Sequence, residues 1–214
     1  MKDATSTRDR NAPPTRALAM GGVAVAIVAL VASHAEATVL VDVSLEDMAR
    51  DADVIVVGRV IRSEAQLVLD PVRGADPHTL TTVQVSEWIV GPGGATVVVD
   101  ELGGEVAGQG LAIAGTARYE PGQEVVLFLE RAGTRLRTYG MALGRFEIRR
   151  GVGGAPDSAF RDLHGVAFAT WQGGRMELEE RAEPAVSLDT FLAYVRSIAN
   201  GYRPLPNVRG GLSR

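Results

Sequence analysis

The chain has 214 residues, of which 46% are hydrophobic and 22% charged; this is the composition of a globular protein and argues against disorder along the whole chain. It contains no cysteine, which excludes disulfides, thiol nucleophiles, thiolate zinc sites and iron–sulfur clusters. The formal net charge is −4, and an acidic balance argues against nucleic-acid binding, which needs a basic surface for the phosphates.

Residues 1–37 predict a secretory signal peptide. Three arginines precede an uncharged stretch at 17–33, and the sequence Ala-Glu-Ala follows at 35–37. A positive region, an apolar region and a small-x-small site in this order are typical of such peptides. We therefore expect cleavage between Ala37 and Thr38, and a mature domain in the periplasm or outside the cell. The alternative is an uncleaved membrane anchor, for which the stretch is short because a bilayer span takes about 20 residues.

The first predicted elements of the mature chain are a short helix and a strand. Ser44 is a candidate N-cap for a helix over 45–51, whose first turn is acidic as the helix dipole favours. The continuous apolar run at 54–57 predicts a strand, extending to residue 61, that is covered on both faces. Gly58 inside this strand indicates a bulge or a sharp bend, as small barrels require.

The middle of the chain alternates between strand patterns and glycine-rich turns. In chain order we expect a loop at 70–79, a strand at 81–90, a turn at 91–94, a strand at 96–101, a loop at 102–110, a short strand at 111–114 and a turn at 120–123.

The second half continues this pattern and ends in a helix. We expect a central strand at 125–129, strands at 135–143 and 145–149, a loop at 151–162, and a β-hairpin formed by 166–171 and 175–179. A helix that Ser187 caps follows and ends at Asn200-Gly201, and a flexible tail occupies 202–214. The helix shows apolar residues at helical spacing.

Many short strands with a helix near each end predict a mainly β fold, and favour a small antiparallel, OB-like barrel or a sandwich over any α/β fold. The predicted organisation is a signal peptide at 1–37, a β-barrel domain at 38–150, a hairpin and C-terminal helix at 151–201 that pack on the same domain, and the tail.

Three segments carry a resemblance to known proteins. They read Ala-Asp-Val-Ile-Val-Val-Gly-Arg-Val at 52–60, Thr-Val-Gln-Val-Ser-Glu-Trp-Ile-Val-Gly at 82–91, and Gly-Thr-Ala-Arg-Tyr-Glu-Pro-Gly-Gln-Glu-Val-Val-Leu-Phe-Leu at 115–129, with Gly103-Gly104 before the third. This pattern resembles uncharacterised secreted bacterial β-domain proteins and, more distantly, the netrin-like modules and the inhibitory domain of the tissue inhibitors of metalloproteinases.

The resemblance implies an OB-type five-stranded barrel and covers residues 52–129. The metalloproteinase inhibitors act through an N-terminal cysteine that chelates the protease zinc. This chain would begin at Thr38 and has no cysteine, so no inhibitory residue is carried over.

No motif in the sequence assigns a catalytic, cofactor-binding or metal-ligating residue. The patterns H-E-x-x-H and G-x-S-x-G are absent. We interpret His78 as a solvated loop residue and His164 as a turn residue, although either could be a general base.

Two clusters of charged residues could be functional sites or ordinary solvent-exposed surface. The carboxylates of Asp100, Glu101 and Glu105 beside a glycine turn could form a calcium site, but they lack the alternating acidic ladder of such loops, so we interpret the segment as a solvated loop. Arg145, Arg149 and Arg150 form a basic cluster that we interpret as the polar face of a strand.

The leading hypothesis is an exported, non-catalytic module without a cofactor that binds a protein or cell-envelope component, with no nucleic-acid partner and with membrane contact only if the signal segment is uncleaved. It predicts an exposed apolar or aromatic patch near Trp88, Trp171 or Tyr119. A regulator of a secreted hydrolase would need an ordered N-terminus at Thr38. An enzyme would need a cavity that brings carboxylates to His78 or His164.

Overall fold

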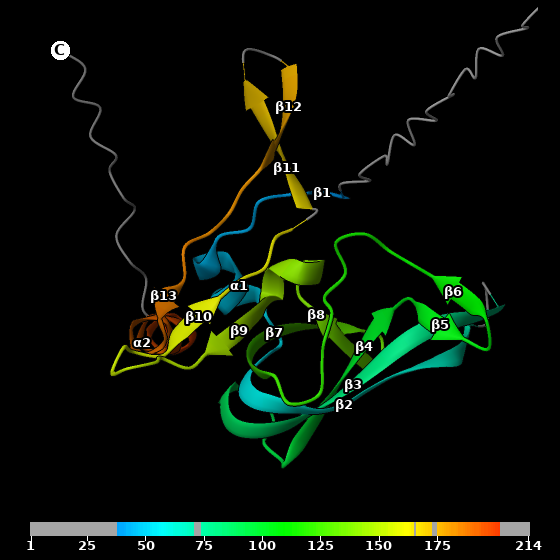
Figure 1. The fold of residues 1–214 in the computed structure, drawn as a ribbon, viewed down its shortest axis with the longest axis horizontal. Helices are drawn as coiled ribbons and strands as arrows, with labels where there is room; N and C mark the ends of the chain where they lie inside the picture. Colours follow the sequence, from blue (N-terminus) through cyan, green and yellow to red (C-terminus); the bar gives the residue numbers. More distant parts are fainter. Residues whose placement is uncertain (1–37, 71–73, 165, 173–174, 202–214) are drawn as a thin grey trace, which may run out of the picture. The chain divides into compact units, whose positions relative to one another are not determined.

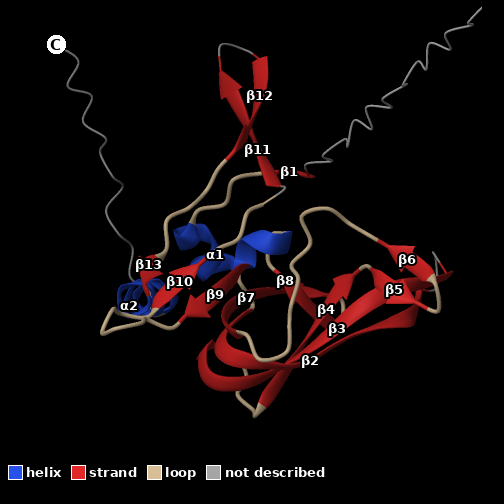
Figure 2. Cartoon of the chain, viewed as in Figure 1, coloured by secondary structure: helices blue, strands red, loops and turns tan. Residues whose placement is uncertain are grey.

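The computed structural model describes residues 38–70, 74–164, 166–172 and 175–201. The predicted signal peptide at 1–37, with the Ala37 side of its cleavage site, and the predicted tail at 202–214 lie outside this range. Within the described range, no helix is both long and apolar enough to cross a membrane. Strands dominate the described chain, as Figure 2 shows, so the mainly β class is confirmed.

The largest sheet is antiparallel, and Figure 1 shows its strands side by side. Its strand order is β13-β10-β9-β7-β2-β3-β4, and β8 also pairs with β7. Its strands are β2 (Val54–Asp70), β3 (Gly74–Val90), β4 (Thr96–Leu102), β7 (Glu124–Ala132), β8 (Arg135–Thr138), β9 (Arg145–Arg149), β10 (Ser158–Phe160) and β13 (Val186–Ser187).

Two smaller sheets and the helices complete the described chain. In the first small sheet β1 (Thr38–Leu40) runs parallel to β11 (Val166–Gln172), which pairs with β12 (Arg175–Glu180). The second is the hairpin of β5 (Gly104–Val106) and β6 (Gln109–Leu111). The helices are α1 (Leu45–Asp51), the 3-10 turn η1 (Met141–Gly144) and α2 (Leu188–Ala199).

Strand β7 separates two hydrophobic cores, because its successive side chains point to opposite faces of the sheet. Val126 and Phe128 face the first core, where both helices pack, and Val125, Leu127 and Leu129 face the second. All five are fully buried. We call the second core the inner core; its other buried members are Val54, Val56, Val60, Val83, Val97, Val99, Ala117 and Tyr119. The predicted central strand is therefore confirmed, as is a β2 covered on both faces.

The predicted loop at 70–79 is wrong, because β2 and β3 form one long hairpin that pairs from Ile55 with Val90 to Asp70 with Gly74. Pro77 lies inside β3, where its missing N–H would normally break a ladder. Its carbonyl accepts a hydrogen bond from the N–H of Gly103 at 2.8 Å. The N and C=O of one strand residue face the same neighbour, so Pro77 removes no bond to β2.

Three further boundaries differ from the prediction. The expected loop at 102–110 contains β5 and most of β6, and the expected loop at 151–162 contains β10. The expected strand at 135–143 ends at Thr138, because Gly140 and Met141 take left-handed φ angles of 57° and 63° that no strand accommodates. The predicted hairpin of β11 and β12 is confirmed.

Both predicted helices are present. The N–H of Asp47 donates to Oγ of Ser44 at 3.0 Å, so the predicted cap of α1 is confirmed. Helix α2 does follow Ser187, but the Ser187 side chain makes no capping bond. The N–H of Leu188 donates instead to the carbonyl of Asp157, which ties the start of α2 to the residue just before β10.

None of the sheets of the described residues closes into a barrel. The edge strand β4 nevertheless lies beside β8. Side chains bridge these two strands: the N–H of Thr138 donates to Oε1 of Glu101 at 2.8 Å, and Nη1 of Arg135 donates to Oδ2 of Asp100 at 2.7 Å.

Candidate ligand-binding site

The face of the large sheet that carries the inner core changes from apolar to polar along its strands. In β4 the inward positions are Val97, Val99 and then Glu101. In β3 the apolar Val83 is followed by two threonines, Thr81 and Thr79, toward the same end. This polar end borders a cavity, so the alternation that builds the core also places polar side chains at its edge.

The hairpin of β5 and β6 and the segment 112–119 form the other walls of this cavity. The chain crosses close over the sheet at Gly104, where a Cβ would lie 2.8 Å from both Cβ of Ala65 and Oγ1 of Thr79. Only glycine permits this approach. The resulting cavity has a volume of about 680 Å³. Its lining includes Ser63, Thr79, Glu101, Leu111, Ile113 and Tyr119.

Glu101 is a buried carboxyl group that forms no ion pair with any residue that the structure describes. The residue is 6% exposed, and its Oε1 accepts the N–H of Thr138. The two arginines on β8 pair elsewhere: Arg137 with Glu130 and Arg135 with Asp100. Burial raises the pKa of Glu101 to about 7, and the hydrogen bonds from Thr138, followed by the charge of Arg137, lower it by less. The group is therefore poised between its neutral and ionised forms near neutral pH.

Two buried hydroxyl groups connect Glu101 to the far wall of the cavity. The hydroxyl of Tyr119 lies 2.5 Å from Oγ1 of Thr138, and the Thr138 hydroxyl also hydrogen-bonds Glu101. Burial, together with the charge of Glu101, raises the pKa of Tyr119 above its ordinary range, so the phenol keeps its proton. When Glu101 is ionised it can only accept, and the chain of hydrogen bonds then runs from Tyr119 through Thr138 to the carboxylate.

This arrangement suits binding by hydrogen bonds more than covalent chemistry. The hydroxyls of Ser63 and Thr79 are engaged, with Oγ1 of Thr81 and the carbonyl of Gly103 respectively. The carboxyl group of Glu101 is the strongest acceptor at the wall. Burying such a group without a charge partner is costly, and a ligand that supplies hydrogen-bond donors would offset that cost.

His78 is not the solvated loop residue that the sequence suggested. It lies in β3, its Nδ1 is 2.5 Å from Oδ1 of Asp100, and its side chain is 17% exposed. Asp100 also accepts from Arg135. The three side chains form a cross-strand network on the face of the sheet opposite Glu101, because Asp100 and Glu101 are neighbours in one strand.

His164 is a turn residue, as predicted. It is exposed and lines a cleft between the segment before β11 and the segment after β12. Its backbone N–H donates to Oδ1 of Asp162. Glu180 and Glu183 line the same cleft, and Glu183 is ion-paired with Arg161. The two histidines thus lie in separate networks, one with Asp100 and one beside Asp162.

The interpretation of residues 100–105 as a solvated loop is wrong. Asp100 and Glu101 are in β4 and point to opposite faces, and only Glu105 is exposed. Because they diverge, the three carboxylates do not converge on one point. Among the residues that the structure describes, no cluster of His, Asp and Glu side chains could hold a metal ion.

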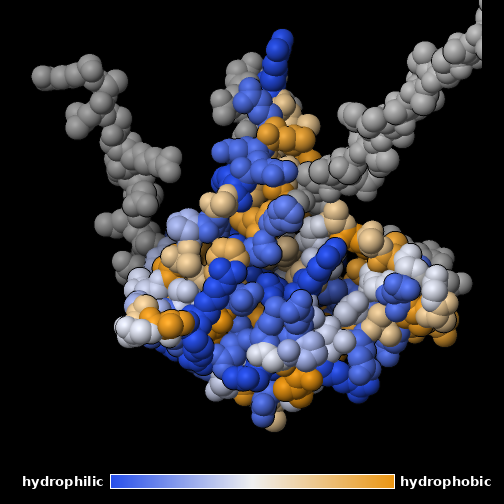
Figure 3. Space-filling view, in the orientation of Figure 1, coloured by the Kyte–Doolittle hydropathy of each residue, from blue (hydrophilic) through white to orange (hydrophobic). Residues whose placement is uncertain are grey.

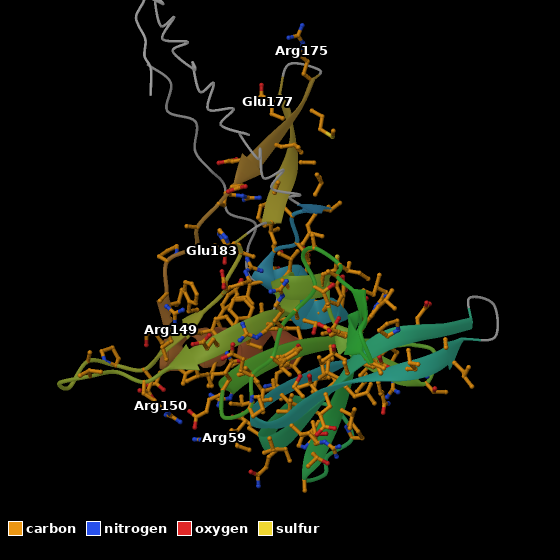
Figure 4. All side chains as sticks on the ribbon, turned by 45° about the vertical axis from the view of Figure 1, so that its right-hand side comes forward. Arg59, Arg149, Arg150, Arg175, Glu177 and Glu183 are labelled. Carbon is orange, nitrogen blue, oxygen red and sulfur yellow. The ribbon has the colours of Figure 1, made fainter. Side chains whose placement is uncertain are left out.

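The predicted basic cluster is divided by burial. Arg149 and Arg150 are exposed, as expected, and Figure 4 labels both of them together with Arg59. Glu124 pairs with both Arg59 and Arg150. Arg145 is only 9% exposed, since its guanidinium donates to Gln123 and lies 5.7 Å from the centre of the Tyr119 ring.

The aromatic patch expected of a protein-binding surface is not found at two of its three residues. Tyr119 is buried, and Trp88 is half-buried with its Nε1 donating to the carbonyl of Gly94. The side chain of Trp171 lies outside the described part of the structure. Exposed apolar side chains occur on β12 at Met176 and Leu178, and Figure 3 shows hydrophobic surface on this hairpin.

The sequence analysis missed Glu101 and Tyr119 as site residues. The signal was present, because Glu101 breaks the inward sequence Val97, Val99 with a charged residue. A charged residue at a predicted inward position is either paired or functional. Tyr119 gave no comparable signal, since it lies in a segment without strand or helix periodicity.

Comparison of the chain with protein-family models, curated sequences and solved structures finds no match.

Proposed function

We propose that the chain is an exported, non-catalytic binding module, and that the cavity beside Glu101 is its ligand site. One observation carries the proposal: a cavity of about 680 Å³ ends at a buried carboxyl group that forms no ion pair within the described part of the chain. Small-molecule sites commonly have volumes of about 300–1,000 Å³, apolar walls and a few polar groups that fix the ligand. A ligand that hydrogen-bonds Glu101 explains why the cost of burying this group is tolerated.

The proposal includes a strand arrangement like that of an OB-type barrel, which the resemblance to netrin-like modules implies. Strands β7, β2, β3 and β4 follow one another in the sheet, and β8 lies beside β4. The side chain of Glu101 bridges β4 and β8 where a closed barrel would have backbone bonds. The ligand site would then lie at the seam of an incomplete barrel.

Native mass spectrometry of the protein recovered from its own host tests the ligand site. We expect a fraction of the protein to carry a bound small molecule that Ala112→Trp removes, because Ala112 is exposed and lines the cavity. Ala132→Trp is the matched control, since Ala132 is exposed at the end of β7. Bound mass that persists in Ala112→Trp, or none in the wild type, would overturn the proposal.

The intact mass in the same experiment tests export. Cleavage between Ala37 and Thr38 predicts a protein in the periplasm or medium whose mass begins at Thr38. A full-length chain found only in membranes would show that residues 17–33 act as an anchor, and it would contradict export as a free domain.

A regulator of a secreted hydrolase is the second candidate, and the order of the N-terminal segment favours it. Thr38–Leu40 pairs in parallel with Val166–Phe168, so the segment after the predicted cleavage site is held in a sheet. Val39 is 44% exposed. If this segment inhibits a hydrolase, deletion of residues 38–40 abolishes inhibition of the host's secreted hydrolases, whereas Ala112→Trp leaves it intact. Inhibition that survives the deletion contradicts this candidate.

A further inference from the structure

We propose that the ligand of the Glu101 cavity is a small organic cation with an apolar body, such as a primary alkylamine. The inference rests on the proposed function, because it assigns a chemical class to the same site. The ligand class is inferred from the hydrogen-bond donors, the acceptors and the charged groups at the cavity wall.

The buried end of the cavity offers acceptors and negative charge. Glu101 is the buried ionisable group that accepts hydrogen bonds there, and the Tyr119 hydroxyl is already engaged with the hydroxyl of Thr138. An ammonium group has three donors and no acceptor, which matches this end. A carboxylate or phosphate ligand would instead bring a second negative charge to a carboxyl group that forms no ion pair with a described residue.

The charges at the outer end of the cavity do not alter this preference. Glu105 and Arg118 line the cavity and are both exposed. Opposite charges that water screens contribute little and offset one another. Glu101 is 6% exposed, so its interaction with a ligand is much less screened than theirs.

The walls beyond Glu101 also carry apolar side chains. Leu102, Leu111 and Ile113 line the cavity, and Ala117 of the inner core lies among them. An alkyl chain would bury apolar surface against these side chains, which favours binding. The combination of one buried carboxyl group with apolar walls fits an amphiphilic cation better than a hydrated metal ion.

The test is a calorimetric titration of the mature full-length protein at pH 8 with three probes of equal length: n-hexylammonium, n-hexanol and hexanoate. We expect hexylammonium to bind about tenfold or more tightly than hexanol, because a charge-assisted hydrogen bond is worth roughly twice a neutral one. Glu101→Gln should weaken hexylammonium binding by about tenfold and leave hexanol binding nearly unchanged. Glutamine keeps an oxygen for the N–H of Thr138, so the fold is preserved.

Glu105→Gln is the matched control, because it removes an exposed carboxylate from the same cavity and should change affinity by less than about threefold. Ala112→Trp should block hexylammonium and hexanol alike. If hexylammonium and hexanol bind equally and Glu101→Gln changes neither, the cavity remains a ligand site but the cationic class is wrong. If hexylammonium does not bind, or hexanoate binds best, the inference is also overturned; the ligand site itself is tested separately by native mass spectrometry.

Discussion

Glu101 occupies an inward position of β4 that follows two buried valines, and it forms no ion pair with any described residue there. Its pKa is raised from 4.5 to about 7 in the folded protein. The folded state therefore binds the proton more tightly than the unfolded state. The stability that this proton contributes is fully present below about pH 4.5 and is lost as pH rises through 7; the shift corresponds to about 3 kcal/mol.

The first prediction concerns the pH dependence of stability in Glu101→Gln. Between about pH 4.5 and 7, the wild type should lose about 3 kcal/mol of unfolding free energy relative to the variant, because glutamine does not ionise. Urea unfolding of both proteins across this range measures the difference. The pKa of the Glu87 carboxyl is lowered by the hydrogen bonds from Arg196, and that of Asp157 by the hydrogen bond from the N–H of Gly151 and then by that from Arg150. Both groups are present in both proteins, so their effects cancel. A difference that does not change with pH would contradict the account.

The second prediction concerns Gly104, which lets β5 approach the sheet. A Cβ there would lie 2.8 Å from Ala65 and from Thr79, whereas a Cβ at Gly93 would meet no atom within 4 Å. Both glycines have positive φ, so alanine strains both backbones. Gly104→Ala should therefore cost about 1–3 kcal/mol more than Gly93→Ala, because it adds overpacking. Equal losses in denaturant unfolding would show that β5 does not pack closely on the sheet.

At the scale of elements, α2 is held by an aromatic cluster on one face of β7. Phe191 of the helix contacts Phe128 and Phe146, with ring centroids 6.4 and 4.6 Å away. Aromatic side chains bury large apolar areas, and contacts between their rings add stability beyond that from the buried area. The helix is thereby fixed to the strand that also forms the inner core.

The third prediction follows from this packing. Phe191→Ala should lower the unfolding free energy by about 3–5 kcal/mol, since it leaves a cavity between α2 and β7. Thr190→Ala changes an exposed neighbour and should stay within about 0.5 kcal/mol of the wild type. Thermal or urea unfolding compares the two. A loss below about 1 kcal/mol for Phe191→Ala would show that α2 is not packed as described.

The elements also show where sequence patterns suffice and where they do not. The helix periodicity of α2 and the apolar run of β7 predicted their buried faces, because both depend on local spacing. The far end of the β2–β3 hairpin, at 70–79, was predicted as a loop, because Gly74 and Pro77 are typical of turns. Its strand conformation depends on Gly103, which lies 26 positions along the chain from Pro77, and no local pattern contains that bond.

At the scale of the whole molecule, the described chain is organised by a sheet with a core on each face. The fold class was predictable, because the repeated strand and turn patterns are local. The site was not, because it forms where the polar end of β3 and β4 meets a crossing segment and β8. The residues of the site are dispersed along the sequence from Ser63 to Thr138. Among them, only Glu101 gave a signal in the sequence, because it interrupts the apolar inward positions of β4.

The central claim is that Glu101 is a buried, unpaired carboxyl group that meets the ligand. The most direct test is the 13C NMR titration of its side-chain carboxyl, assigned with Glu101→Gln, with and without n-hexylammonium. The account predicts a midpoint of about 7 for the free protein and a lower one with the amine, because a nearby cation favours the ionised form. A midpoint near 4.5, the ordinary value for glutamate, that the amine does not change would contradict it.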